Sequence, residues 1–165
     1  MSILMDIGAA FRGPRAQMQH QLSIMSEPRT LMLGLTACFL SFVADLPGLA
    51  AGVTAAGESS DILNGKLGAL FIWRVLFGTL FLYAIAAVFR LILKLFKGQG
   101  TWAQTRLALM WAVMVATPLV LISGICKVFT LPPVFLVASL LTTVVFFWQW
   151  VTCLAVVEFP RSTKT

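Results

Sequence analysis

The stretch that decides the fold is residues 102–128, WAQTRLALMWAVMVATPLVLISGICKV. From Leu107 to Cys126 it has no charged side chain. A helix over this stretch is therefore long and apolar enough to cross a hydrocarbon core about 30 Å thick. Thr101 and Gln104 stand at its start with the spacing of a capping box, which predicts that the helix begins at Trp102.

Three further stretches have the same composition. The whole chain is 59% hydrophobic and 11% charged, whereas soluble domains carry about 25% charged residues. The sequence therefore predicts an all-α, polytopic transmembrane bundle of four spanning helices. The three other predicted spans are residues 31–49, 67–96 and 133–157. Residues 50–64, small and polar, predict a solvated loop, whereas 98–100 and 131–133 predict tight turns.

The N-terminal segment, residues 1–28, has an amphipathic pattern instead. Gly13 and Pro14 divide it into two short predicted helices. It lacks the features of a secretory signal. Its apolar stripe is expected either at the lipid interface or against the protein's own bundle. The predicted organisation is this segment, a transmembrane domain over residues 29–158 and a tail over 159–165. The stripe consists of Ile3, Leu4, Ile7, Phe11, Met18, Leu22 and Met25.

The distribution of Lys and Arg predicts the orientation. Nine of these residues flank the side that carries both termini and the 98–100 turn, whereas only Lys66 and Lys127 flank the other side. Cationic residues concentrate in cytoplasmic loops. We therefore expect both termini in the cytoplasm.

Three of the charged residues within or at the ends of the spans are expected to form ion pairs. Asp45 and Arg74 are expected at similar depth, and an unpaired charge there costs about 2 to 3 kcal/mol. We therefore predict an intramembrane ion pair between them. Glu158 closes the fourth span and is expected to pair with Arg90 or with Arg106.

Reactive chemistry is nearly absent from the sequence. His20 is the only histidine, and no phosphate loop, nucleophile motif or close cysteine pair occurs. We therefore expect no enzymatic activity, no cofactor and no metal site. No segment outside the spans is long enough for a nucleic-acid-binding domain. An aromatic cluster in the fourth span predicts a face for lipid or for a partner; its members are Phe146, Phe147, Trp148 and Trp150.

The second turn and the helix after it resemble a known family. The run FKGQGTWAQTRLALMWA over residues 96–112, followed by Pro118, is similar to the core of bacterial members of the Yip family, the Ypt/Rab-interacting-type membrane proteins. Residues 11–15, FRGPR, are similar to the opening of the short bacterial members. The resemblance implies a noncatalytic polytopic membrane protein with a cytoplasmic N-terminus. It draws attention to the turn residues Gly98, Gly100, Thr101, Trp102 and Arg106.

Two functions are compatible with these features. The first is an accessory, assembly or scaffold subunit that packs against other membrane proteins in the bilayer. The second is a small oligomeric transporter or channel in which Asp45 and Arg74 line a path, which would require a homo-oligomer.

Overall fold

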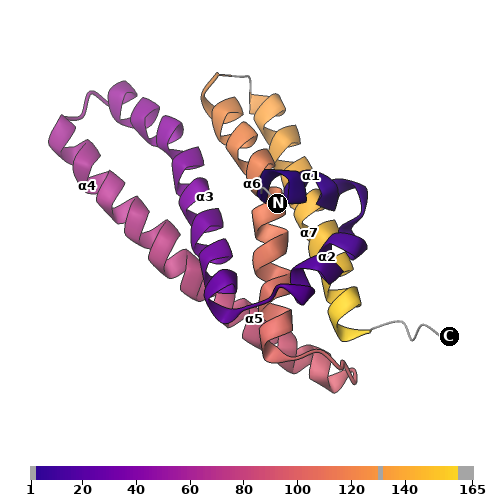
Figure 1. Cartoon of the computed structure of the whole chain (residues 1–165). Helices are drawn as coiled ribbons and strands as arrows, with labels where there is room; N and C mark the ends of the chain where they lie inside the picture. The colour runs from indigo at the N-terminus through magenta and orange to yellow at the C-terminus, as the bar shows by residue number, and fades with distance from the viewer. Residues whose placement is uncertain (1–2, 130–131, 160–165) are drawn as a thin grey trace.

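The computed structural model describes residues 3–129 and 132–159, and every regular element within these ranges is helical (Figure 1). The predicted all-α class is therefore confirmed. In chain order the elements are α1 (Ile3–Arg12), α2 (Pro14–Ser23), α3 (Glu27–Ala55), α4 (Ser60–Phe71), η1 (Ile72–Phe77), α5 (Gly78–Leu95), α6 (Trp102–Phe129) and α7 (Pro132–Glu158).

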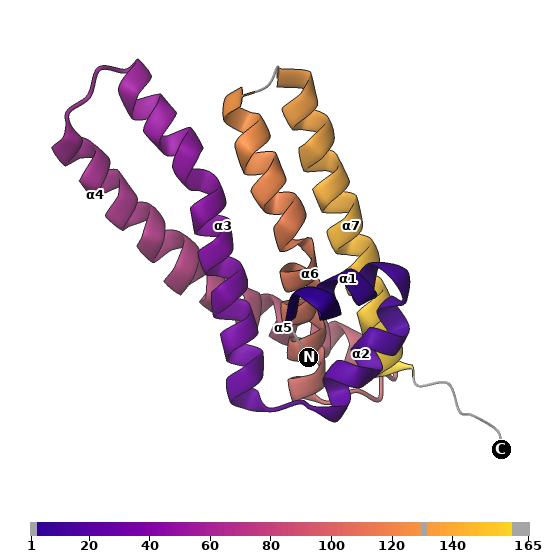
Figure 2. The ribbon, with the colours of Figure 1, turned by 45° about the horizontal axis from the view of Figure 1, so that its top comes forward.

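Four helical segments are long and apolar enough to span a membrane, as predicted. They are α3, the continuous segment Ser60–Leu95 formed by α4, η1 and α5, then α6 and α7. Figures 1 and 2 show two hairpins, α3 with α4 and α6 with α7, that diverge toward the end carrying the α3–α4 connection. The predicted turn at 131–133 falls partly on residues 130–131, which lie outside the described residues.

The first span is longer than the sequence predicted at both ends. Ser26 caps α3, its hydroxyl accepting a hydrogen bond from the Arg29 amide at 3.4 Å, so the helix begins at Glu27 rather than Leu31. At the other end α3 continues through Pro47 to Ala55. The predicted loop at 50–64 was therefore wrong, because the connection is only residues 56–59. The glycines, serines and acidic residues of this stretch indicated a loop, yet most of them lie at 57–61, and the alanines at 50, 51 and 55 favour a helix.

The second span contains a feature that the sequence did not predict. Residues 72–77 form a π-helical turn, η1, between α4 and α5. A π-turn widens the helix by one residue and often occurs at functional positions. This turn includes Arg74, and the segment runs obliquely to α6 and α7 in both views (Figures 1 and 2).

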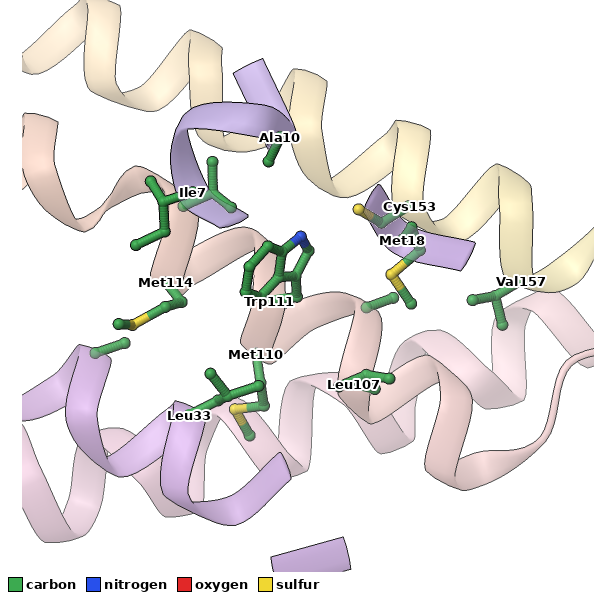
Figure 3. Close-up of a cluster of buried hydrophobic side chains, with 13 residues drawn as sticks. Ile7, Ala10, Met18, Leu33, Leu107, Met110, Trp111, Met114, Cys153 and Val157 are labelled. Atoms are coloured by element: carbon green, nitrogen blue, oxygen red, sulfur yellow. The ribbon is translucent and has the colours of Figure 1, made fainter. Parts of the chain in front are cut away.

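Helix α6 is the centre of the bundle. It packs against α3, α5 and α7, and 50% of its most apolar stretch is buried inside the chain, compared with 11% for α7. Trp111 is completely buried in the main apolar cluster (Figure 3). The predicted capping box forms at the start of α6: the Thr101 amide donates to Gln104 Oε1 at 2.9 Å and the Gln104 amide donates to Thr101 Oγ1 at 3.3 Å.

The N-terminal helices pack on the protein's own bundle. Ile7 and Ala10 of α1 and Met18 of α2 are buried in the cluster around Trp111 (Figure 3). The predicted stripe is nevertheless divided, because Ile3 and Phe11 remain exposed. Only part of the stripe therefore belongs to the core, and the other part faces the surroundings of the protein.

Candidate functional sites at the two ends of the bundle

A buried glutamate joins three helices where α5 ends, α6 begins and α7 ends. The Glu158 side chain has no exposed surface. Its Oε2 lies 2.6 Å from Arg90 Nη1 and accepts a hydrogen bond from the Gly100 amide at 3.0 Å. Its Oε1 accepts a hydrogen bond from the Thr105 hydroxyl at 2.8 Å. We call this arrangement the Glu158 site. Of the two partners considered for Glu158 from the sequence, the structure shows Arg90.

The glycines of the turn are required by the Glu158 site. A Cβ atom on Gly100 would lie 2.7 Å from Glu158 Oε1, and one on Gly98 would collide with Glu158 Oε2. The intervening Gln99 amide donates to the backbone carbonyl of Glu158 at 3.1 Å. Lys97, at φ 60°, turns the chain out of α5. The turn is therefore shaped around the end of α7, which the sequence motif alone does not reveal.

Arg106 forms a separate contact at the same end of the bundle. Its Nη2 lies 2.7 Å from Glu27 Oε1, and its guanidinium carbon lies 5.6 Å from the ring centroid of Tyr83. Trp102 at the start of α6 is exposed. Arg106 thereby connects the start of α3 with α6 and α5, and the Glu158 site connects α5, α6 and α7. Polar contacts therefore connect all four spans at this end of the bundle.

Asp45 and Arg74 form an ion pair between α3 and η1. Arg74 Nη2 lies 2.6 Å from Asp45 Oδ2, and Arg74 Nε donates to the same oxygen at 2.7 Å. The Arg74 side chain is 48% exposed and the Asp45 side chain 27% exposed. The pair is therefore partly exposed at the surface of the described part of the bundle.

Charge reversal tests whether this pair lies within the membrane. We expect Asp45→Arg and Arg74→Asp to reduce accumulation in the membrane fraction. Each variant places two like charges side by side at a depth where a single unpaired charge costs about 2 to 3 kcal/mol. The double reversal should restore accumulation, as measured by quantitative immunoblotting. The matched control exchanges Glu58 and Lys66, an exposed pair at the α3–α4 connection, and should have no effect. A double reversal that accumulates no better than the single ones would contradict the prediction.

An apolar groove runs beside Arg74 along η1 and α5. It has a volume of about 540 Å³. It contains the exposed small residue Ala84, which allows another helix to approach closely, whereas a Cβ atom on Gly78 would point toward Cys38 of α3. Its lining residues are Trp73, Arg74, Phe77, Gly78, Leu80, Phe81 and Ala84. We call it the η1–α5 groove.

The predicted aromatic face of α7 is divided by the structure. Trp150 is buried, with its ring centroid 4.5 Å from that of Phe89 on α5, and Phe146 stacks on it with centroids 5.7 Å apart. Only Phe147 and Trp148 are exposed. Trp150 was therefore wrongly assigned to the outer face, because its side chain fills the space between α5 and α7.

The fold and these sites define an integral membrane protein with a helical transmembrane bundle. Within the described ranges, no group of three His, Cys, Asp or Glu side chains is placed to hold a metal ion. The family model of the Yip1 domain matches residues 11–164. The chain therefore belongs to the Yip1-domain family. Comparison with curated proteins and with solved structures finds no match.

Proposed function

We propose that the protein is a noncatalytic accessory, assembly or scaffold subunit that packs against other membrane proteins. The observation that carries this proposal is the η1–α5 groove with the half-exposed Arg74 at its edge. A charged pair facing lipid is costly, and a neighbouring helix with a polar side chain would lower that cost. The exposed Ala84 gives such a helix room for close contact.

The exposed aromatic pair on α7 supports a second contact surface. Phe147 and Trp148 project from a helix that buries little of its apolar surface within the chain. The excess of Lys and Arg on one side supports cytoplasmic termini. The similarity of residues 96–112 to bacterial members of the family supports a bacterial inner (plasma) membrane location. In that orientation the Glu158 site lies at the cytoplasmic end.

Native co-purification tests the proposed function. At native expression, mild-detergent extraction should recover the chain in a stoichiometric complex whose partner is identified by mass spectrometry. Ala84→Trp fills the η1–α5 groove and should release that partner. The control Ile122→Trp adds the same side chain to an exposed position of α6 and should retain it. A monodisperse protomer without a partner would contradict the proposal.

The alternative is a small oligomeric transporter or channel. The surface position of the Asp45–Arg74 pair favours a path formed between copies of the chain over a path through one copy. In proteoliposomes, this alternative predicts an ion or solute flux that Asp45→Asn abolishes. A flux that is unchanged by the substitution would show that Asp45 does not line the path.

A further inference from the structure

A pocket between α1 and α3 is lined by two opposite charges that do not pair with each other. It has a volume of about 230 Å³, and Asp6 and Arg29 both line it. Asp6 is only 7% exposed, yet its carboxylate has no hydrogen bond or ion pair among the described residues. Arg29 Nη2 donates a hydrogen bond to Gln21 Oε1 at 3.0 Å. The buried Arg29 Nε has no hydrogen-bond partner within residues 3–129 and 132–159.

This arrangement favours a ligand that carries both charges. The Asp6 carboxylate has no partner among the described residues, and a guanidinium presents five donors, of which the exposed terminal amino groups of Arg29 are still available here. A ligand with an anion near Arg29 and a cation near Asp6 would satisfy both groups at once. An anion alone would leave Asp6 without a partner, and a cation alone would leave the positive charge of Arg29 without a counter-charge.

The position of the pocket along the membrane normal indicates the chemical class of that ligand. Helix α3 has 29 residues, which corresponds to roughly 43 Å of length, whereas the hydrocarbon core is about 30 Å thick. About four residues at each end therefore extend into the headgroup layer. Arg29 is the third residue of α3, and Leu31 and Met32 follow it with exposed apolar side chains. Lipid headgroups and the upper parts of acyl chains occupy these levels.

We propose that this pocket binds the headgroup of a phospholipid with a primary amine, a phosphatidylethanolamine. Its phosphate accepts hydrogen bonds from Arg29, and its ammonium group donates to Asp6. A primary ammonium has N–H donors for the carboxylate, whereas the quaternary ammonium of phosphatidylcholine has none. The inference is independent of the proposed function, because the pocket lies between α1 and α3 and shares no residue with the η1–α5 groove.

Competition between lipids tests the site in the full-length purified chain. Native mass spectrometry would follow retention from an equimolar mixture of phosphatidylethanolamine, phosphatidylcholine and phosphatidylglycerol with identical acyl chains. We expect phosphatidylethanolamine to be retained about tenfold over phosphatidylcholine, the size expected for one charge-assisted hydrogen bond. Asp6→Asn should abolish this preference. Arg29→Gln should reduce retention of both lipids, because both carry the phosphate.

Matched controls separate an effect of the pocket from a general effect of charge, and a second variant separates lost binding from lost folding. Asp61→Asn and Arg15→Gln make the same changes at exposed positions outside the pocket and should leave lipid retention unchanged. Arg29→Lys retains a cation and should preserve more binding than Arg29→Gln, which separates lost binding from lost folding. Equal retention of the three lipids, a preference for phosphatidylglycerol, or a preference that survives Asp6→Asn would each overturn the proposal.

Discussion

Replacing Glu158 with alanine should lower the free energy of unfolding by about 3 to 5 kcal/mol, which is the cost of removing one partner from a buried ion pair. The Arg90 side chain is only 11% exposed and would keep its charge without the carboxylate. The Gly100 amide and the Thr105 hydroxyl would also lose their acceptor. The measurement is reversible unfolding in mixed detergent micelles, followed by tryptophan fluorescence.

An exposed ion pair at the same end provides the control. Glu27→Ala removes the carboxylate that faces Arg106, in a pair whose side chains are partly exposed. Such pairs contribute about 0 to 1 kcal/mol, so this variant should remain close to the parent protein. Equal destabilisation by the two alanine variants would contradict the assignment of Glu158 as the buried centre of this end.

A double substitution separates the charge from the packing. Glu158→Met with Arg90→Met removes both members of the buried pair and replaces them with apolar side chains of similar length. Replacing such a pair by apolar residues is often neutral or stabilising, so the double variant should be more stable than Glu158→Ala. If it is equally unstable, the hydrogen bonds to the turn, rather than the ion pair, stabilise this end.

Local patterns were sufficient to predict most of the architecture. The four spans follow from the length of the apolar stretches, which needs no knowledge of contacts. The capping box at Thr101 is also local, since both of its hydrogen bonds join residues three apart. The same holds for the division of the N-terminal segment at Pro14, where α2 begins.

Long-range contacts account for what the sequence did not reveal. Arg90 was one of two partners predicted for Glu158, but the complete burial of this carboxylate and its hydrogen bonds from Gly100 and Thr105 depend on residues more than 50 positions earlier in the chain. The buried position of Trp150 depends in the same way on Phe89 of another helix. The π-turn around Arg74 has no recognised sequence pattern, because it depends on how the whole span packs against α3.

Gly124→Ala should destabilise the protein by about 1 to 3 kcal/mol, the usual cost of overpacking a close contact. A Cβ atom on Gly124 of α6 would collide with the backbone oxygen of Ala44 on α3 and would lie 2.9 Å from its carbonyl carbon. Backbone atoms cannot rotate away as a side chain can, so the two helices must separate. Small residues permit this close approach of spanning helices. Reversible unfolding in mixed micelles is again the measurement.

Gly65→Ala is the matched control for this contact, because it makes the same change in a spanning helix with nothing within 4 Å of the new Cβ atom. Alanine favours a helix over glycine by up to about 1 kcal/mol, so the control should be neutral or stabilised. The opposite signs of the two effects distinguish a steric contact from helix propensity, which is the same in both variants.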